Sequence, residues 1–175
     1  MILWKTLLEN TILVFKPSTI FEDHRGQYIE TYNHRTFEGI TKLAFLGVSI
    51  PEFVCDDISV SRKGVFRGIH GDFETWKLVS CLRGAFYLVI VNNAVLVPSN
   101  MLHTGLLLSE RNHLQVLIPP GYGNGHLSLE EGTIFHYKQS TYYDRDSQFT
   151  IPWRSLLPGL WLPFEPEILS VRDGG

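Results

Sequence analysis

The sequence predicts an all-β protein whose strands form a sandwich or barrel. From residue 52 to residue 140, segments rich in aromatic and β-branched residues follow one another, separated by Gly, Pro, Asn or Ser. The spacing of these breaks is typical of a sandwich or barrel. No long stretch repeats its apolar residues every 3.6 or so positions, so only a few short helices are expected.

Length and composition predict one domain. The 175 residues are enough to build a hydrophobic core without disulfides or metal. No internal repeat, linker or low-complexity tract divides the chain, so a single domain spanning residues 1–175 is expected. The 15 Lys and Arg residues against 18 Asp and Glu provide no basic field, which excludes nucleic acid and an anionic membrane as expected partners.

The expected location is the cytoplasm. Cys55 and Cys81 are the only cysteines, which argues against a disulfide-rich secreted scaffold. Glu9 and Asn10 interrupt the apolar N-terminus, so the run and the cleavage site of a signal peptide are missing. The apolar run at residues 85–91 is far too short to cross a bilayer.

The N-terminal part is predicted to hold strands and one short helix. Residues 11–16 have a strand pattern that Pro17 ends. Residues 21–33 place a turn at residues 23–26 before a half-buried strand pattern. Residues 34–40 are expected to form a short helix.

The later strands are predicted at residues 52–61, 64–69, 76–84, 85–93, 103–109, 113–119, 125–130 and 133–140. Residues 149–173 are rich in proline and contain two tryptophans, which suits a segment that wraps over the outside of the sheet with a short helix.

Charged side chains gather on two of these strands. Arg67, His70 and Lys77 stand among apolar residues, where a buried cation costs free energy unless it meets an anion. That anion is either a ligand or a neighbouring side chain. The alternative interpretation is a set of surface charges beside one core histidine.

The segment PPGYGNGH at residues 119–126, after a His-bearing strand, has the layout of a cupin-like jelly roll. A metal-binding cupin needs a second His next to His70 on the first strand, where Asp72 stands, and a His at the position of Asn124. His126 lies on the same strand face as Asn124, so a metal site remains an open alternative. We nevertheless expect no metal and no other cofactor.

Without a metal, the candidate groups suit proton abstraction beside a carbonyl. His70 is a titratable base, Tyr137 is an acid, and Lys77 and Arg67 are fixed positive charges. A cation stabilises the enolate oxygen as charge develops there. A tyrosine that returns the proton from the opposite face would invert the carbon.

Six motifs, in order, resemble those of the nucleotide-sugar 3,5-epimerases typified by dTDP-4-dehydrorhamnose 3,5-epimerase. They are FEDHRGQYIETYN, SVSRKGVFRGIH, WKLVSCLRGAFY, LIPPGYGNGH, FHYKQSTYYD and PEILSVRD. The resemblance covers the chain from about Leu13 to Asp173. It implies a cofactor-independent, homodimeric epimerase that inverts C3, C5 or both of a GDP- or dTDP-linked 4-keto sugar, for capsule, lipopolysaccharide or another surface polysaccharide.

The resemblance also implies roles for individual residues. The catalytic group is His70 as base, Asp173 as the carboxylate that orients it, Tyr137 as acid and Lys77 as the cation beside the enolate. The substrate-binding group is Arg25, Glu30, Arg67, Asn124 and Tyr143. The strand that ends at Lys16 is a candidate for pairing across a homodimer interface.

Three departures from the family pattern indicate a substrate other than dTDP-4-dehydro-6-deoxyglucose. The family turn PPGFAHGF usually carries His where this chain has Asn124, and an amide cannot relay a proton. The loop at residues 71–76 is shorter, and Cys55, Asp56 and Asp57 replace the usual QDN. The sequence variants RGIHGD, TWKL and NGH are most similar to the branch of the family that acts on GDP-linked 4-keto-heptoses.

Two other functions remain open. A ketoisomerase would move the carbonyl between C3 and C4, but it typically has two His on the first strand, and only His70 is present. A sugar-nucleotide-binding module without catalysis would not need His70, Asp173 and Tyr137 together.

Overall fold

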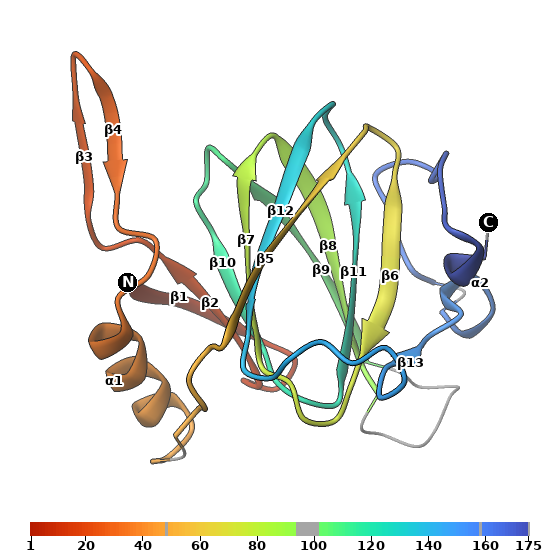
Figure 1. Ribbon diagram of the computed structural model, residues 1–175, viewed down its shortest axis with the longest axis horizontal. Helices are drawn as coiled ribbons and strands as arrows, with labels where there is room; N and C mark the ends of the chain where they lie inside the picture. Colours follow the sequence, from red (N-terminus) through yellow and green to blue (C-terminus); the bar gives the residue numbers. More distant parts are fainter. Residues whose placement is uncertain (48, 94–101, 158, 175) are drawn as a thin grey trace.

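The computed structural model describes residues 1–47, 49–93, 102–157 and 159–174. Two antiparallel sheets face each other, and a hairpin projects away from them near the N-terminus (Figure 1). The sheets have the strand orders β1-β2-β10-β7-β12-β5 and β13-β6-β11-β8-β9. The prediction of an all-β, cupin-like jelly roll with few short helices is confirmed.

The first sheet consists of β1 (Ile2–Leu7), β2 (Ile12–Lys16), β10 (Gln115–Ile118), β7 (Lys77–Arg83), β12 (Thr133–Gln139) and β5 (Cys55–Ser61). The second sheet consists of β13 (Phe149–Thr150), β6 (Phe66–Gly71), β11 (Tyr122–Ser128), β8 (Ala85–Asn92) and β9 (His103–Ser109). The projecting hairpin is β3 (Ile20–Asp23) and β4 (Gly26–Ile29).

The main core lies between the two sheets. Val79 and Val116 of the first sheet and Phe86, Leu88 and Ile90 of the second are fully buried there. Alternate residues of each strand point into this layer, as expected for two packed sheets.

The C-terminal segment covers the outer face of the second sheet, as predicted (Figure 1). Trp153 and Leu157 pack with Phe66 there, and the rings of Trp153 and Phe66 lie 5.1 Å apart. This segment contains the short helix α2 (Trp153–Leu156) and the 3-10 helix η2 (Val171–Asp173).

Helix α1 (His34–Ala44) is longer than the predicted helix at residues 34–40. The side chain of Asn33 caps its first turn by accepting from the Thr36 amide. Phe37 and Thr41 are both buried, and Phe37 packs against apolar residues of the first sheet, so the buried side of the helix extends past residue 40.

Two expectations about the N-terminal region are wrong. The strand ending at Lys16 has both edges paired inside its own sheet, between β1 and β10, because residues 2–7 form a strand that was not predicted. The hairpin is not half-buried, since Phe21 is 67% and Tyr28 65% exposed.

Among the described residues, no helix is long and apolar enough to span a bilayer.

Candidate active site

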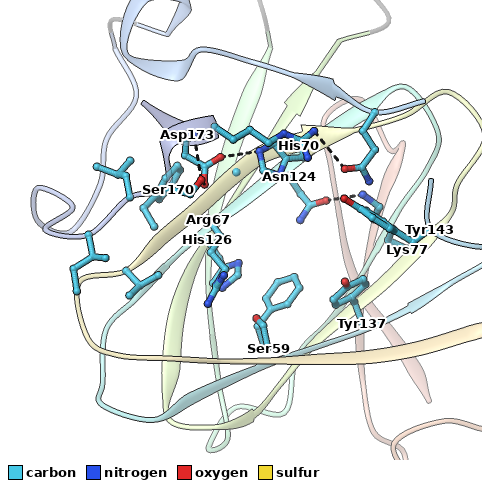
Figure 2. A pocket seen from close by; sticks show the side chains of 18 of the residues that line it. Ser59, Arg67, His70, Lys77, Asn124, His126, Tyr137, Tyr143, Ser170 and Asp173 are labelled. Atoms are coloured by element: carbon cyan, nitrogen blue, oxygen red, sulfur yellow. Dashed lines mark hydrogen bonds and ion pairs between the residues drawn. The ribbon is translucent and has the colours of Figure 1, made fainter. Parts of the chain in front are cut away.

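A cavity of about 590 Å³ opens between the sheets and the C-terminal segment, and it gathers most of the predicted site residues. Figure 2 shows these side chains pointing into the same space from different elements. The predicted residues that line the cavity are Arg67, His70, Lys77, Asn124, Tyr137, Tyr143 and Asp173.

His70 and Asp173 form a close pair in the cavity wall. Nε2 of His70 lies 2.7 Å from Oδ1 of Asp173, and the Asp173 side chain is only 4% exposed. Strand β6 carries His70 between β11 and β13. The C-terminal segment is fastened to the start of that strand, because the Phe66 amide donates to the Ile168 carbonyl at 3.0 Å. The backbone therefore brings the two ends of the pair together.

Ser170 holds the Asp173 carboxylate in place. Its hydroxyl donates to Oδ2 of Asp173 at 2.8 Å and accepts from the Asp173 amide at 3.3 Å. Burial acts to raise the pKa of Asp173, but the close contact with His70 and the hydrogen bond from Ser170 outweigh it, so the pKa lies below its ordinary value. Asp173 is therefore an anion that can fix the orientation and tautomer of His70.

Lys77 is a buried cation at the start of β7. Its Nζ lies 3.4 Å from Oδ1 of Asn124, which is a long contact to a neutral group. Burial lowers the pKa of Lys77, the Asp72 carboxylate opposes that shift, and the Arg172 guanidinium adds to it. A weakly paired cation in such a site is well placed to stabilise negative charge on a ligand oxygen.

Tyr137 enters the cavity from β12. Burial raises the pKa of this phenol, and the nearby Asp57 carboxylate and Tyr143 phenol raise it further. The hydroxyl is therefore protonated near neutral pH and can donate a proton. Figure 2 shows it apart from the His70–Asp173 pair, beyond Asn124.

The approach of β6 to β11 depends on Gly68. This residue has φ of +116°, and a Cβ atom there would lie 2.5 Å from the Cα of Gly125. Only glycine fits such a backbone and such a contact. The close approach sets His70 directly opposite Asn124 in the ladder.

Arg67, exposed and at the cavity mouth, donates from Nε to the Ser61 hydroxyl at 3.1 Å.

Arg25 and Glu30 do not line the cavity of their own chain. Arg25 sits at the tip of the projecting hairpin with an 80% exposed side chain and pairs with Asp23 at 2.6 Å. Glu30 follows the same hairpin and accepts from the Asn33 amide group at 3.5 Å. The motif that contains both residues forms an arm that leaves the sandwich (Figure 1).

Sequence reasoning missed several polar residues of the cavity: Ser59, Gln139, Gln148, Ser170 and Arg172. Arg172 donates to the Thr150 hydroxyl at 3.0 Å. Its place beside Asp173 in the SVRD motif was the available signal. Among the described residues, no three His, Cys, Asp or Glu side chains are grouped closely enough to hold a metal ion.

The model of one protein family, described as dTDP-4-dehydrorhamnose 3,5-epimerase, matches residues 6–175. The relative from Salmonella typhimurium with that name is 35% identical, over 99% of this chain and 92% of its own length. The one from Escherichia coli K12 is 37% identical, over 93% of this chain and 86% of its own.

Solved structures agree with these matches. The epimerase from Legionella pneumophila, solved in complex with dTDP-4-keto-L-rhamnose, superposes with a TM-score of 0.84 at 31% identity and covers 98% of this chain and 89% of its own. A 3'-monoepimerase from Streptomyces bikiniensis, in complex with dTDP-quinovose, has a TM-score of 0.80 at 26% identity, with 94% and 81% covered.

The fold and these matches define an enzyme of the isomerase class. More particularly, the chain belongs to the dTDP-4-dehydrorhamnose 3,5-epimerase family.

Proposed function

We propose that this chain is a cofactor-independent epimerase that inverts C3, C5 or both of a dTDP-linked 4-keto sugar. The observation that carries the proposal is one cavity holding the His70–Asp173 pair at 2.7 Å, a protonated tyrosine and a buried lysine. The dTDP-linked ketosugar bound to the Legionella pneumophila relative supports this substrate class.

The first step is proton abstraction by His70. Its Nε2 faces Asp173, so Nδ1 takes the proton from the carbon next to the ketone. The C–H bond breaks, its electron pair forms a C=C bond, and the carbonyl oxygen becomes an enolate oxygen. Asp173 stabilises the imidazolium that results. The ammonium group of Lys77 stabilises the enolate oxygen, with Asn124 beside it.

The second step is proton return by Tyr137. The enolate carbon takes the phenolic proton from the face opposite His70, and the carbonyl re-forms with inverted configuration. The tyrosinate then recovers a proton from solvent, and His70 releases the one it took. No redox change occurs, so the reaction needs no nicotinamide, and the ammonium group of Lys77 takes the role that a Lewis-acid metal ion would have at the enolate oxygen.

The diphosphate is placed at the cavity mouth, where Arg67 is exposed. We place the hairpin arm of a second copy there too, in a homodimer. Three features support this arrangement: the arm leaves its own sandwich, it exposes Phe21 and Tyr28, and Arg25 at its tip is a cation suited to phosphate. Arg25 and Glu30 then bind substrate in the partner's cavity rather than their own.

A GDP-linked 4-keto-heptose is the second candidate substrate. The variants RGIHGD, TWKL and NGH favour it, because they are most similar to the branch that acts on such heptoses; NGH contains Asn124. A neutral amide offers a hydrogen-bond donor and an acceptor but no proton relay.

Incubation in heavy water with each 4-keto sugar nucleotide, followed by NMR at C3 and C5, tests the proposal. We expect deuterium and inverted configuration at one or both carbons of a dTDP-linked substrate. Appearance of a 3-keto product would establish a ketoisomerase. Binding without any exchange, on both nucleotide series, would establish a non-catalytic module.

A further inference from the structure

His126 lies on the floor of the cavity and has no role in the mechanism above. Its side chain is 3% exposed, and its ring stacks on Phe135 with centroids 4.1 Å apart and planes 6° apart. Phe86 packs against the same ring at 5.3 Å. The imidazole is therefore fixed in one orientation.

The Nε2 atom of His126 is buried and has no hydrogen-bond partner among the residues that the structure describes. The Ser59 hydroxyl is buried and unpaired in the same sense, and Ser59 pairs with Phe135 across the ladder of β5 and β12. Both residues line the cavity. Two unpaired polar atoms flanking one aromatic ring are costly unless a ligand or a water satisfies them.

His126 is unsuited to act as a base. Burial and the charge of Arg67 lower its pKa to about 3, against the opposing effect of Asp173. The ring is therefore neutral near neutral pH, with one nitrogen that donates and one that accepts. Such a group suits a sugar hydroxyl rather than a phosphate.

The position of His126 selects one hydroxyl, given the proposed function. If the C4 carbonyl lies at Lys77 and the diphosphate on C1 lies at Arg67, the sugar ring spans the cavity between them. Figure 2 shows His126 on the Arg67 side of the cavity, across from Lys77. His126 and Arg67 are partners in the β6–β11 ladder. On a pyranose ring, the hydroxyl that lies next to C1 is the one on C2.

We infer that His126, with Ser59, recognises the C2 hydroxyl of the substrate and makes this enzyme selective against 2-deoxy sugars. The family motif PPGFAHGF has Phe at the position of His126, so this contact distinguishes the chain from that pattern. A site built around a hydroxyl discriminates strongly against a substrate that lacks it, because its polar atoms are then left unpaired.

The test compares dTDP-glucose and dTDP-2-deoxyglucose by calorimetric binding, and the matching 4-keto-6-deoxy pair by deuterium exchange. For the parent protein we expect the 2-hydroxy compound to be favoured by about tenfold or more. In His126→Phe the ratio of the two affinities should fall to near one, because only the 2-hydroxy compound binds more weakly. His126→Gln, which keeps a donor and an acceptor, restores part of the preference.

Phe135→Leu loosens the stacking without removing the imidazole. It should therefore lower the preference for the 2-hydroxy compound less than His126→Phe does. A parental preference that survives in His126→Phe and His126→Gln, or a parent that binds both compounds equally, overturns the inference. If no compound exchanges deuterium, the proposed function fails, but the binding ratios still decide the role of His126.

Discussion

The His70 imidazole lies 2.7 Å from the Asp173 carboxylate, although one residue is on a central strand and the other ends a 3-10 turn at the C-terminus. Neither element alone provides the pair. The pair forms where the C-terminal segment is fastened to the start of β6 by the hydrogen bond from the Phe66 amide to the Ile168 carbonyl.

Asp173→Asn should lower kcat about 10²- to 10⁴-fold with little effect on KM, because an amide does not stabilise the imidazolium and favours the wrong tautomer. Ser170→Ala, which keeps the carboxylate but loses its hydrogen bond, should have a smaller effect in the same direction. Steady-state kinetics measures both. A parental kcat in Asp173→Asn would show that His70 needs no carboxylate.

The same substitution has a pH signature in stability. The folded pKa of Asp173 lies below the ordinary 3.8, so the paired carboxylate stabilises the fold above that value and loses the contribution as the pH falls through the folded pKa. Asp173→Asn should therefore flatten this part of the acid-unfolding profile. Urea titrations at a series of acidic pH values check the slope.

Lys77→Met should abolish exchange without destabilising the protein. The parent buries a cation whose pKa is lowered from 10.5, so its stability rises as the pH increases through the folded pKa toward that value. Methionine removes the burial cost, and the free energy of unfolding near neutral pH should be unchanged or about 1 kcal/mol higher. Marked destabilisation together with retained exchange would contradict the role given to Lys77.

Gly68→Ala should destabilise the protein by about 2 kcal/mol or more and displace His70. Gly26→Ala is a matched control, because Gly26 has nearly the same φ of +118° but no atom within 4 Å of the added Cβ. The control carries the backbone strain alone and should cost about 1 kcal/mol. Equal losses in the two variants would show that crowding against β11 is unimportant.

Arg25→Ala should raise KM with a smaller effect on kcat, because a phosphate contact is made about equally in the ground and transition states. Arg35→Ala, at an exposed position on α1, should leave both constants unchanged. In the homodimer proposed above, a hybrid of one Arg25→Ala and one His70→Asn subunit has one cavity with both residues intact and one cavity that lacks both. Mixing the two variants should therefore restore activity with a parental KM. An unchanged KM with a much lower kcat would contradict the placement of Arg25.

Strand positions in the sandwich were predictable because their apolar alternation reflects burial on one face. The helix was predicted too short, since Thr41 hides its hydroxyl by donating to the Phe37 carbonyl and packs as an apolar residue. β1 was missed because its Lys5 and Thr6 interrupt the apolar run. Local patterns do not report such tertiary contacts.

The core of the site was predictable from motifs, whereas its supporting contacts were not. His70 and Asp173 each stand in a recognisable motif, but the Ser170 hydrogen bond and the stacking of His126 on Phe135 depend on segments distant in sequence. Arg25 also stands in a motif, but a motif does not indicate whether the residue serves the cavity of its own chain or that of a second copy.

Exchange and inversion, measured together in His70→Asn and Tyr137→Phe, test the account most directly. Each variant is incubated with dTDP-4-keto-6-deoxyglucose in heavy water and followed by NMR at C3 and C5. His70→Asn should lose both exchange and inversion. Tyr137→Phe should still form the enolate, so exchange with retained configuration persists while inversion falls steeply, and the ratio of exchange to inversion rises. Continued exchange in His70→Asn, or parental inversion in Tyr137→Phe, would contradict the assignment of base and acid.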